Sequence, residues 1–324
     1  MSRRPVDLPA LVEGVGRGRK RAIARAITLV ENRDPLAYDL VRELYPRTGS
    51  AAVAGFTGPP GVGKSTLLAA LVGHLRGQGK RVGVVSVDPS SPYSKGALLG
   101  DRIRLADHFL DEGVFIRSMS TRGHLGGVAE ATLQALLILD AAGMDVLLLE
   151  TVGVGQSEVE VASVADTVVL VLQPGSGDSI QALKAGVMEI PDIIVINKSD
   201  HPAARTMRTE IRSVLSLDRE REWRVPIVET EALEGEGTEA LWQAVLDHRA
   251  FLERDGGLDA RRRSNIEHEV VAVAVAQARR RLDAALAADP ELRLLLDEVH
   301  ARRLDPLTAT RQIADRVFRE RDDG

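Results

Sequence analysis

Eight consecutive residues early in the chain have the types and the spacing of a phosphate-binding loop. Gly58-Pro59-Pro60-Gly61-Val62-Gly63-Lys64-Ser65 fits the pattern Gly-x4-Gly-Lys-Ser/Thr, and Thr66 follows it. The glycines let the backbone wrap a β-phosphate, so that successive amide N–H groups face the anion. Lys64 supplies positive charge to the β- and γ-phosphates, and the Ser65 hydroxyl is a ligand for Mg²⁺. A plain glycine turn at a helix start accounts for the glycines but not for Lys64 and Ser65 together.

A second motif, Asn197-Lys198-Ser199-Asp200, follows an apolar run and has the Asn-Lys-x-Asp spacing of a guanine-binding loop. The Asp200 carboxylate can accept hydrogen bonds from guanine N1–H and N2–H₂, whereas adenine has an acceptor at N1 and no amino group at C2. A mismatched base leaves buried polar groups unpaired, which disfavours it. Asn and Asp also favour plain turns after strands, so the motif gains its weight from its position downstream of the phosphate loop.

A third segment adds candidates for contact with the base. Thr230-Glu231-Ala232-Leu233 stands where many GTPases have a Ser-Ala-Lys or Ser-Ala-Leu loop. The match is imperfect, because Glu231 takes the place of the serine. Glu231, Ala232 and Leu233 are therefore predicted base-contacting residues.

Three acidic residues are candidates for the metal site. Glu150 ends the apolar run 146–150 and is followed by Thr151-Val152-Gly153, so it replaces the Asp of the usual Asp-x-x-Gly element. A carboxylate there can hold a Mg²⁺-bound water while the Gly153 amide senses the γ-phosphate. Asp88 ends the run 82–87, and Asp101 follows Leu99-Gly100. For each acid the alternative is a structural helix cap or loop carboxylate.

The position that holds the water-orienting glutamine in Ras-type enzymes, directly after Asp-x-x-Gly, is here Val154, which cannot polarise water. Gln156 lies two residues further along and is the substitute candidate. We therefore assign Lys64, Glu150 and Gln156 as catalytic candidates and expect slow intrinsic hydrolysis that a partner accelerates.

The elements that position these motifs follow from the hydrophobic pattern. Apolar runs rich in Val and Ile alternate with helical segments, which predicts a predominantly parallel sheet flanked by helices. The runs are 51–57, 82–87, 146–150, 167–173, 192–197 and 225–229. The phosphate loop joins the first run to a helix from Lys64 to about Arg76, and the run 82–87 completes a βαβ unit whose second strand is parallel to the first.

Helical periodicity dominates both ends of the chain. It predicts amphipathic helices over 17–33 and 36–44 and helices after about Phe251, where the arginine runs 261–263 and 279–281 are interpreted as solvated faces. We expect three parts: a helical extension at 1–48, a nucleotide-binding domain at 49–250 and a helical arm at 251–324.

Composition narrows the function classes. Of 324 residues 44% are hydrophobic, enough for a buried core, and the formal charge of −5 gives no field that attracts nucleic acid. The chain has no cysteine, which excludes disulfides and thiolate metal ligands. Its start lacks the apolar stretch of a signal peptide, and acidic residues interrupt each candidate membrane span. We expect a soluble, cytoplasmic protein without nucleic-acid or membrane partners.

Taken together, the motifs resemble those of the MeaB/ArgK family of P-loop GTPases, which includes the methylmalonic-aciduria type A protein. The resemblance covers roughly residues 17 to 250 and rests, in order after the phosphate loop, on VDPSSP, LLGDR, TRGHLGG, ETVGVGQSEVEV and NKSD; RAIARAITLVE is similar to the family's first helix. It implies an α/β P-loop NTPase fold of the SIMIBI type, GTP and GDP with Mg²⁺ as ligands, and homodimerisation. It also implies an adenosylcobalamin-dependent acyl-CoA mutase as the partner.

What the resemblance implies for single residues follows the motifs. Nucleotide, metal and switch roles fall on 58–66, Asp88, Asp101, Glu150 and 197–200. One segment departs from the family pattern: Gly175-Ser176-Gly177-Asp178-Ser179-Ile180-Gln181-Ala182-Leu183-Lys184 stands in place of a Thr/Gly-Asp-x-Leu-Gln-Gly-Ile-Lys-Lys-like switch. We interpret residues 173–184 as the nucleotide-sensitive segment that faces the mutase.

Three other classes of P-loop protein fit less well. The name ArgK suggests a small-molecule or protein kinase. Such a kinase should carry an arginine-rich lid and an acceptor site, and the sequence shows neither. A nickel metallochaperone GTPase needs Cys/His clusters, whereas the seven histidines here are scattered. A signal-recognition GTPase should have a methionine-rich basic domain, and this chain has five methionines and a net negative charge. The absence of an Asp-x-His-x-x-Gly element indicates that the chain does not itself ligate cobalamin.

Overall fold

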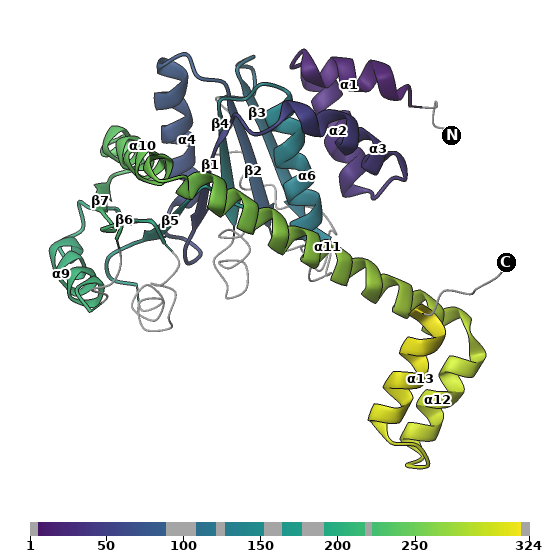
Figure 1. The fold of residues 1–324 in the computed structure, drawn as a ribbon. Helices are drawn as coiled ribbons and strands as arrows, with labels where there is room; N and C mark the ends of the chain where they lie inside the picture. Colours follow the sequence, from purple (N-terminus) through teal and green to yellow (C-terminus); the bar gives the residue numbers. More distant parts are fainter. Residues whose placement is uncertain are drawn as a thin grey trace. The chain divides into compact units, whose positions relative to one another are not determined.

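The computed structural model describes residues 6–88, 108–120, 127–151, 164–176, 191–217 and 222–318; at Asp88, Ser120, 127–129 and Glu269 it describes the backbone alone. The chain divides into two compact units, Met1–Glu269 and Val270–Gly324. The first unit holds a sheet with helices on both faces, and the second is helical (Figure 1). Among the described residues, no helix combines the length and apolar character that a membrane crossing needs.

The centre of the first unit is a seven-stranded sheet with the order β3-β2-β4-β1-β5-β6-β7. All neighbouring strands are parallel. The strands are β1 Ala52–Thr57, β2 Val82–Asp88, β3 Val114–Ser120, β4 Val146–Thr151, β5 Thr167–Leu172, β6 Ile193–Asn197 and β7 Ile227–Thr230. The predicted parallel sheet is confirmed, and so is the parallel direction of β1 and β2, although β4 lies between them. Strand β3 was not predicted.

Helices cover both faces of this sheet (Figure 1). They are α1 Leu8–Gly16, α2 Lys20–Glu31, α3 Leu36–Leu44, α4 Lys64–Gly77, α6 Gly127–Ala141, α9 Ala204–Leu215, α10 Thr238–Arg254 and α11 Gly257–Ala288, which continues into the second unit. A short 3₁₀ helix spans Tyr45–Arg47. The predicted helices at 17–33, 36–44 and 64–76 are confirmed within three residues at each end, and α1 is an additional helix.

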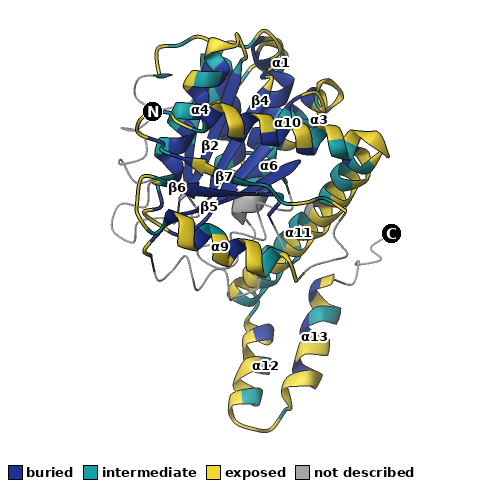
Figure 2. Ribbon diagram, turned by 90° about the vertical axis from the view of Figure 1, so that its left-hand side faces the viewer, coloured by how far each residue is buried: buried dark blue, intermediate teal, exposed yellow. Residues whose placement is uncertain are grey.

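Two large apolar cores hold the layers together. On one face, α4 and α10 pack on the sheet through residues such as Leu68, Leu71 and Trp242, all buried. On the other face, α6 packs on the sheet and α1 to α3 pack around α6, with Ile23 and Ile27 fully buried. Because helices cover both faces, the strands are buried along nearly their whole length (Figure 2). Strands covered on both faces read as unbroken apolar runs, as β4, β5 and β6 do.

The start of α11 is anchored to the edge of the sheet where β1, β5 and β6 begin. Arg262 donates to both carboxylate oxygens of Asp166, at 2.8 and 2.7 Å, and to the carbonyl oxygens of Gly49 and Ala51. Arg261 donates to both oxygens of Asp192. The expectation that this arginine run is a solvated face is therefore wrong for Arg261 and Arg262, because each finds a planar carboxylate that matches its guanidinium.

The second unit is a small helical assembly. It contains the end of α11, α12 Pro290–His300 and α13 Pro306–Phe318. Leu292, Ile313 and Val317 form its buried centre. The helical character predicted for the end of the chain is confirmed.

Candidate nucleotide-binding site

The phosphate loop joins β1 to α4, at the edge of the sheet where the parallel strands end. Gly58 and Gly63 have positive φ angles of 139° and 92°, which glycine adopts readily. Neither position has room for a side chain: a Cβ at Gly58 would collide with the carbonyl oxygen of Val171, and one at Gly63 would meet the Asn197 amide. The glycine spacing read from the sequence thus has a steric cause in the neighbouring strands.

Lys64 is the first residue of α4, and its side chain folds back over the loop. Its ammonium donates to the carbonyl oxygens of Gly58 at 2.6 Å and Pro59 at 3.0 Å, and the residue is only 7% exposed. A buried cation has to be hydrogen-bonded. The two carbonyls fix this charge at the loop, where the motif requires positive charge beside phosphate.

Ser65 and Glu150 form the metal-site candidate. The Ser65 hydroxyl donates to Glu150 Oε1 at 2.6 Å, and the Ser86 hydroxyl donates to Oε2 at 3.2 Å. Glu150 lies near the end of β4 and is 6% exposed, so its carboxylate is held between α4 and β2 in a buried position. Hydroxyl and carboxylate oxygens are the donors that Mg²⁺ prefers, and a protein site for Mg²⁺ needs few of them because phosphate and water complete the shell. The residues present fit the ion.

The guanine-binding motif follows β6, two strands from β1, and Asn197 joins it to its neighbours. The Asn197 side chain donates to the Val62 carbonyl oxygen at 2.8 Å. Its own oxygen accepts from the Thr230 hydroxyl at 3.1 Å and the Ala232 amide at 3.2 Å. One buried side chain therefore ties the phosphate loop, the guanine loop and the segment after β7 together.

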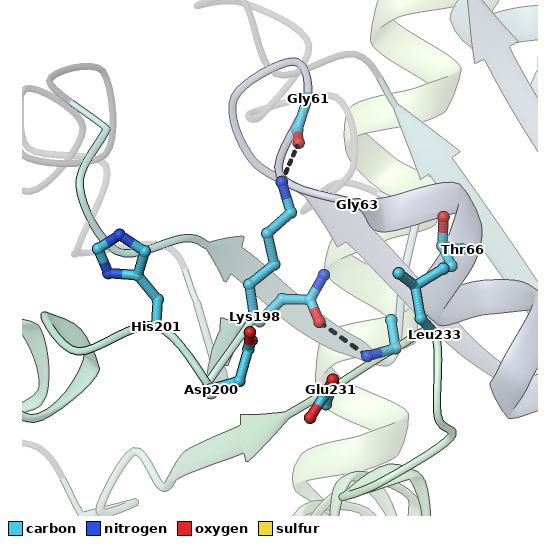
Figure 3. A pocket seen from close by; sticks show the side chains of 10 residues that line it. Gly61, Gly63, Thr66, Lys198, Asp200, His201, Glu231 and Leu233 are labelled. Atoms are coloured by element: carbon cyan, nitrogen blue, oxygen red, sulfur yellow. Dashed lines mark hydrogen bonds between the residues drawn. The ribbon is translucent and has the colours of Figure 1, made fainter.

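A cavity of about 690 Å³ opens beside these contacts (Figure 3). Its lining comes from three segments of the chain: Gly61, Gly63, Thr66, Asn197, Lys198, Asp200, His201, Glu231, Ala232 and Leu233. The volume lies within the usual range for small-molecule sites. Lys198, in the left-handed region at φ 57°, reaches across to the Gly61 carbonyl oxygen at 3.2 Å.

Glu231 makes the cavity wall acidic together with Asp200. Desolvation is the largest cause that raises the pKa of the Glu231 carboxyl, and the negative charges of Asp200, Glu236 and Glu234 raise it further. A serine, which many GTPases have at this position, would not add charge. The departure from the Ser-Ala-Lys pattern thus changes the electrostatics of the wall.

The structure brings most of the predicted site residues together. The segment 58–66, Glu150, the segment 197–200 and Glu231, Ala232 and Leu233 lie around one sheet edge. Asp101, Gly153 and Gln156 lie outside the described residues, as does the side chain of Asp88. Within the described part of the chain, no group of three His, Cys, Asp or Glu side chains suits a metal ion.

Sequence reasoning gave no side-chain role to four contributors, although Thr230 and Gln173 lie in segments that it named, 230–233 and 173–184. Ser86 supports Glu150, Thr230 supports Asn197, His201 lines the cavity, and Gln173 accepts from Lys198. Ser86 faces Glu150 because β2 pairs with β4 in register, and that pairing is visible only in the structure. The others depend on tertiary packing.

Comparison with known proteins supports the motif-based resemblance. A model of the MeaB family, described as methylmalonyl Co-A mutase-associated GTPase, matches residues 23–287. A putative GTPase of Pyrococcus abyssi is 47% identical over 96% of this chain and 95% of its own length. GTPase ArgK of Escherichia coli is 38% identical over 81% and 83%. The mouse methylmalonic aciduria type A homolog is 37% identical over 80% and 67%.

One solved structure extends the likeness to the whole fold. The crystal structure of an LAO/AO transport system kinase matches with a TM-score of 0.71 and 30% identity, over 98% of this chain and 99% of that one. The family model covers well over half of the chain, including the phosphate loop and the guanine motif that form the cavity. The chain therefore belongs to the MeaB family of GTPases.

Proposed function

We propose that this protein is a GTP-binding and GTP-hydrolysing chaperone that gates the loading or protection of the cofactor in an adenosylcobalamin-dependent acyl-CoA mutase, methylmalonyl-CoA mutase or a relative. The observation that carries the nucleotide part is the joint between the two motifs: Asn197 of the guanine loop bonds to Val62 of the phosphate loop beside a cavity that Asp200 lines. The description of the family and the name of the mouse relative support the mutase part.

The residues of the phosphate half have separate tasks. The amides of the loop and the Lys64 ammonium bind the β- and γ-phosphates, which are the groups that these donors suit. Ser65 and Glu150 would hold Mg²⁺, with the Glu150 carboxylate acting directly or through a bound water. The bound ion supplies charge neutralisation at the phosphates.

The base half selects guanine. Asp200 accepts from guanine N1–H and N2–H₂, while Asn197 holds the loop against its neighbours. An adenine at this position presents no pair of N–H donors to Asp200. Its N1 atom is an acceptor, so it would face the carboxylate without a hydrogen bond.

The isolated chain hydrolyses GTP slowly in this proposal. Val154 offers no group that orients water, and Gln156 is the substitute. A partner that completes the site then raises the rate of hydrolysis. The rate of hydrolysis then determines how long the complex stays in its GTP-bound state.

Communication with the mutase runs through residues 173–184. Strand β5 ends at Leu172, so residues 173–176 start at the sheet edge that carries the phosphate loop. A GTPase drives a partner only by the difference in affinity between its nucleotide states. The mutase complex must therefore tighten or loosen when GTP is replaced by GDP.

The test is to measure mutase affinity and mutase inactivation with GDP and with a non-hydrolysable GTP analogue. The wild type, Lys184→Ala and the control Lys80→Ala, at an exposed lysine after α4, are compared. We expect nucleotide-dependent affinity in the wild type and the control and a smaller difference in Lys184→Ala. Identical binding and inactivation in every combination would remove the mechanism.

A kinase is the second candidate function, because the solved relative is named as one. A kinase passes the γ-phosphoryl group to an acceptor other than water. Release of inorganic phosphate in step with GTP consumption supports the GTPase, whereas transfer of the γ-phosphoryl group to protein or to a small molecule supports the kinase.

We also propose that the protein is cytoplasmic and that it forms a homodimer through the arm at 251–324.

A further inference from the structure

The segment that follows β5 contacts the guanine loop through one hydrogen bond and passes close to the residue that follows the loop. The Lys198 ammonium donates to the side-chain oxygen of Gln173 at 2.5 Å. Two residues further along, Gly175 has a φ of 75°, and a Cβ there would lie 3.4 Å from the ring of His201. Residues 173–176 therefore lie directly against the guanine loop.

The Lys198 side chain is held by two acceptors, one on the phosphate loop and one on the segment after β5. Its ammonium is shared between the Gly61 carbonyl oxygen, on the phosphate loop, and Gln173 Oε1, after β5. A lysine side chain in solution samples many rotamers, and ordering it costs free energy. Acceptors that fix it before the ligand arrives reduce the cost of binding. Because Lys198 itself lines the cavity, its position determines the shape of the base site.

We propose that Gln173 is a positioning residue of the guanine-nucleotide site, which holds Lys198 at the cavity wall and ties the guanine loop to the start of segment 173–184. The inference rests on the proposed nucleotide site and deepens it, but it does not depend on a mutase. It assigns to the first residue of segment 173–184, which lies outside the phosphate-binding and guanine-binding motifs, a role in nucleotide retention.

Two consequences distinguish this role from ordinary packing. Loss of the Gln173 side-chain oxygen leaves Lys198 with one of its two acceptors, the Gly61 carbonyl oxygen, and speeds GDP release. Because the effect passes through the ammonium of Lys198, removing Gln173 has no further effect once that ammonium is absent. Binding effects between coupled positions are reciprocal, so nucleotide in the cavity also restrains residues 173–176.

The experiment measures the release rate and the affinity of fluorescently labelled GDP with the full chain. The variants are Gln173→Ala, Gln173→Glu, Lys198→Met and the double variant Gln173→Ala/Lys198→Met. Lys198→Met keeps most of the length of the stem and removes the charge. Gln243→Ala is the matched control, because Gln243 makes a comparable side-chain hydrogen bond to Asp247 on the exposed face of α10, outside the cavity lining.

We expect Gln173→Ala to release GDP about tenfold faster, the size of effect typical of a hydrogen bond to a charged group. Gln173→Glu, which retains an acceptor for the ammonium, stays within about twofold of the wild type, and Gln243→Ala releases GDP at the wild-type rate. The double variant matches Lys198→Met, as a double-mutant cycle requires of two residues that act through one contact.

An unchanged release rate in Gln173→Ala would overturn the inference. So would a double variant whose effect is the sum of the two single effects, because Gln173 would then act independently of Lys198. Failure of the wild type to bind GDP at all would overturn the nucleotide site itself, and this inference with it.

Discussion

Replacement of Asn197 by alanine is the sharpest test of how the two halves of the site are joined. Asn197 is 2% exposed and makes three side-chain hydrogen bonds, to Val62, Thr230 and Ala232. The alanine variant leaves three polar groups of the surrounding loops without their partner. It also opens the space into which a Cβ at Gly63 would project.

The magnitude follows from these three bonds. Each contributes about 1 kcal/mol net, and a buried partner left unpaired costs somewhat more, so Asn197→Ala should lower the free energy of unfolding by about 3 kcal/mol. For a unit of this size the loss corresponds to a fall in thermal midpoint of roughly 6 to 12 °C. GDP affinity falls as well, because the guanine loop loses its fixed position.

Urea unfolding followed by circular dichroism, with and without GDP, measures both effects. Asn265→Ala is the control, since Asn265 makes one long bond of 3.4 Å to the Ala165 carbonyl oxygen. Asn197→Asp separates hydrogen bonding from volume: it keeps the size but turns a second oxygen toward the Val62 carbonyl, and we expect it to destabilise at neutral pH at least as much as alanine. Equal stability of Asn197→Ala and Asn265→Ala would show that the three bonds do not join the loops as described.

Three further predictions concern other parts of the first unit. Asp200→Asn should weaken GDP and GTP binding and raise the relative affinity for xanthine nucleotides, because the amide reverses one hydrogen-bonding role; calorimetry with the three nucleotides shows whether the order changes. Glu150→Ala should reduce Mg²⁺-dependent GTP hydrolysis more than GDP binding, and an unchanged hydrolysis rate would return Glu150 to a structural role. The side-chain hydrogen bond from Arg76 is the main cause that lowers the pKa of Asp111 below 3.8, so this pair stabilises the fold above that pH and loses its contribution as the pH falls through the lowered pKa. Thermal melts over an acid series should therefore show a flatter acid limb for Arg76→Ala; a limb as steep as that of the wild type would contradict the assignment.

The sequence predicted the parts of the site that local chemistry determines. The phosphate loop, the start of α4 at Lys64 and the guanine loop after β6 all depend on residue types at fixed spacing. The parallel sheet was predictable because strands buried on both faces are continuous apolar runs. These features need no knowledge of distant residues.

The features that were missed depend on distant partners. Strand β3 contains Arg117, Ser118 and Ser120, so its run is not apolar. Arg117 donates to Glu31 and Thr28 of α2. Helix α1 has nine residues and gains stability from packing Leu11 and Val15 into the core around α2. The sequence around Arg261 and Arg262 suggests solvated charges. Their partners, Asp192 and Asp166, lie at the sheet edge and are distant in the sequence.

Gln173 illustrates the same limit at the site itself. Gln173 falls at the start of the predicted segment 173–184, but its bond to Lys198 could not be predicted from the sequence, because it depends on β5 and β6 being neighbours in the sheet. Pattern reading finds residues whose role is set by their neighbours in sequence, and it misses those whose role is set by the strand order.

The most direct test of the guanine site is a calorimetric titration of the wild-type chain with GDP and with ADP, each in the presence of Mg²⁺. Asp200 and the cavity beside it predict that GDP binds at least about 100-fold more tightly than ADP, because adenine offers no pair of N–H donors to the Asp200 carboxylate. Equal affinities for the two nucleotides would contradict the guanine site on which the proposed function rests.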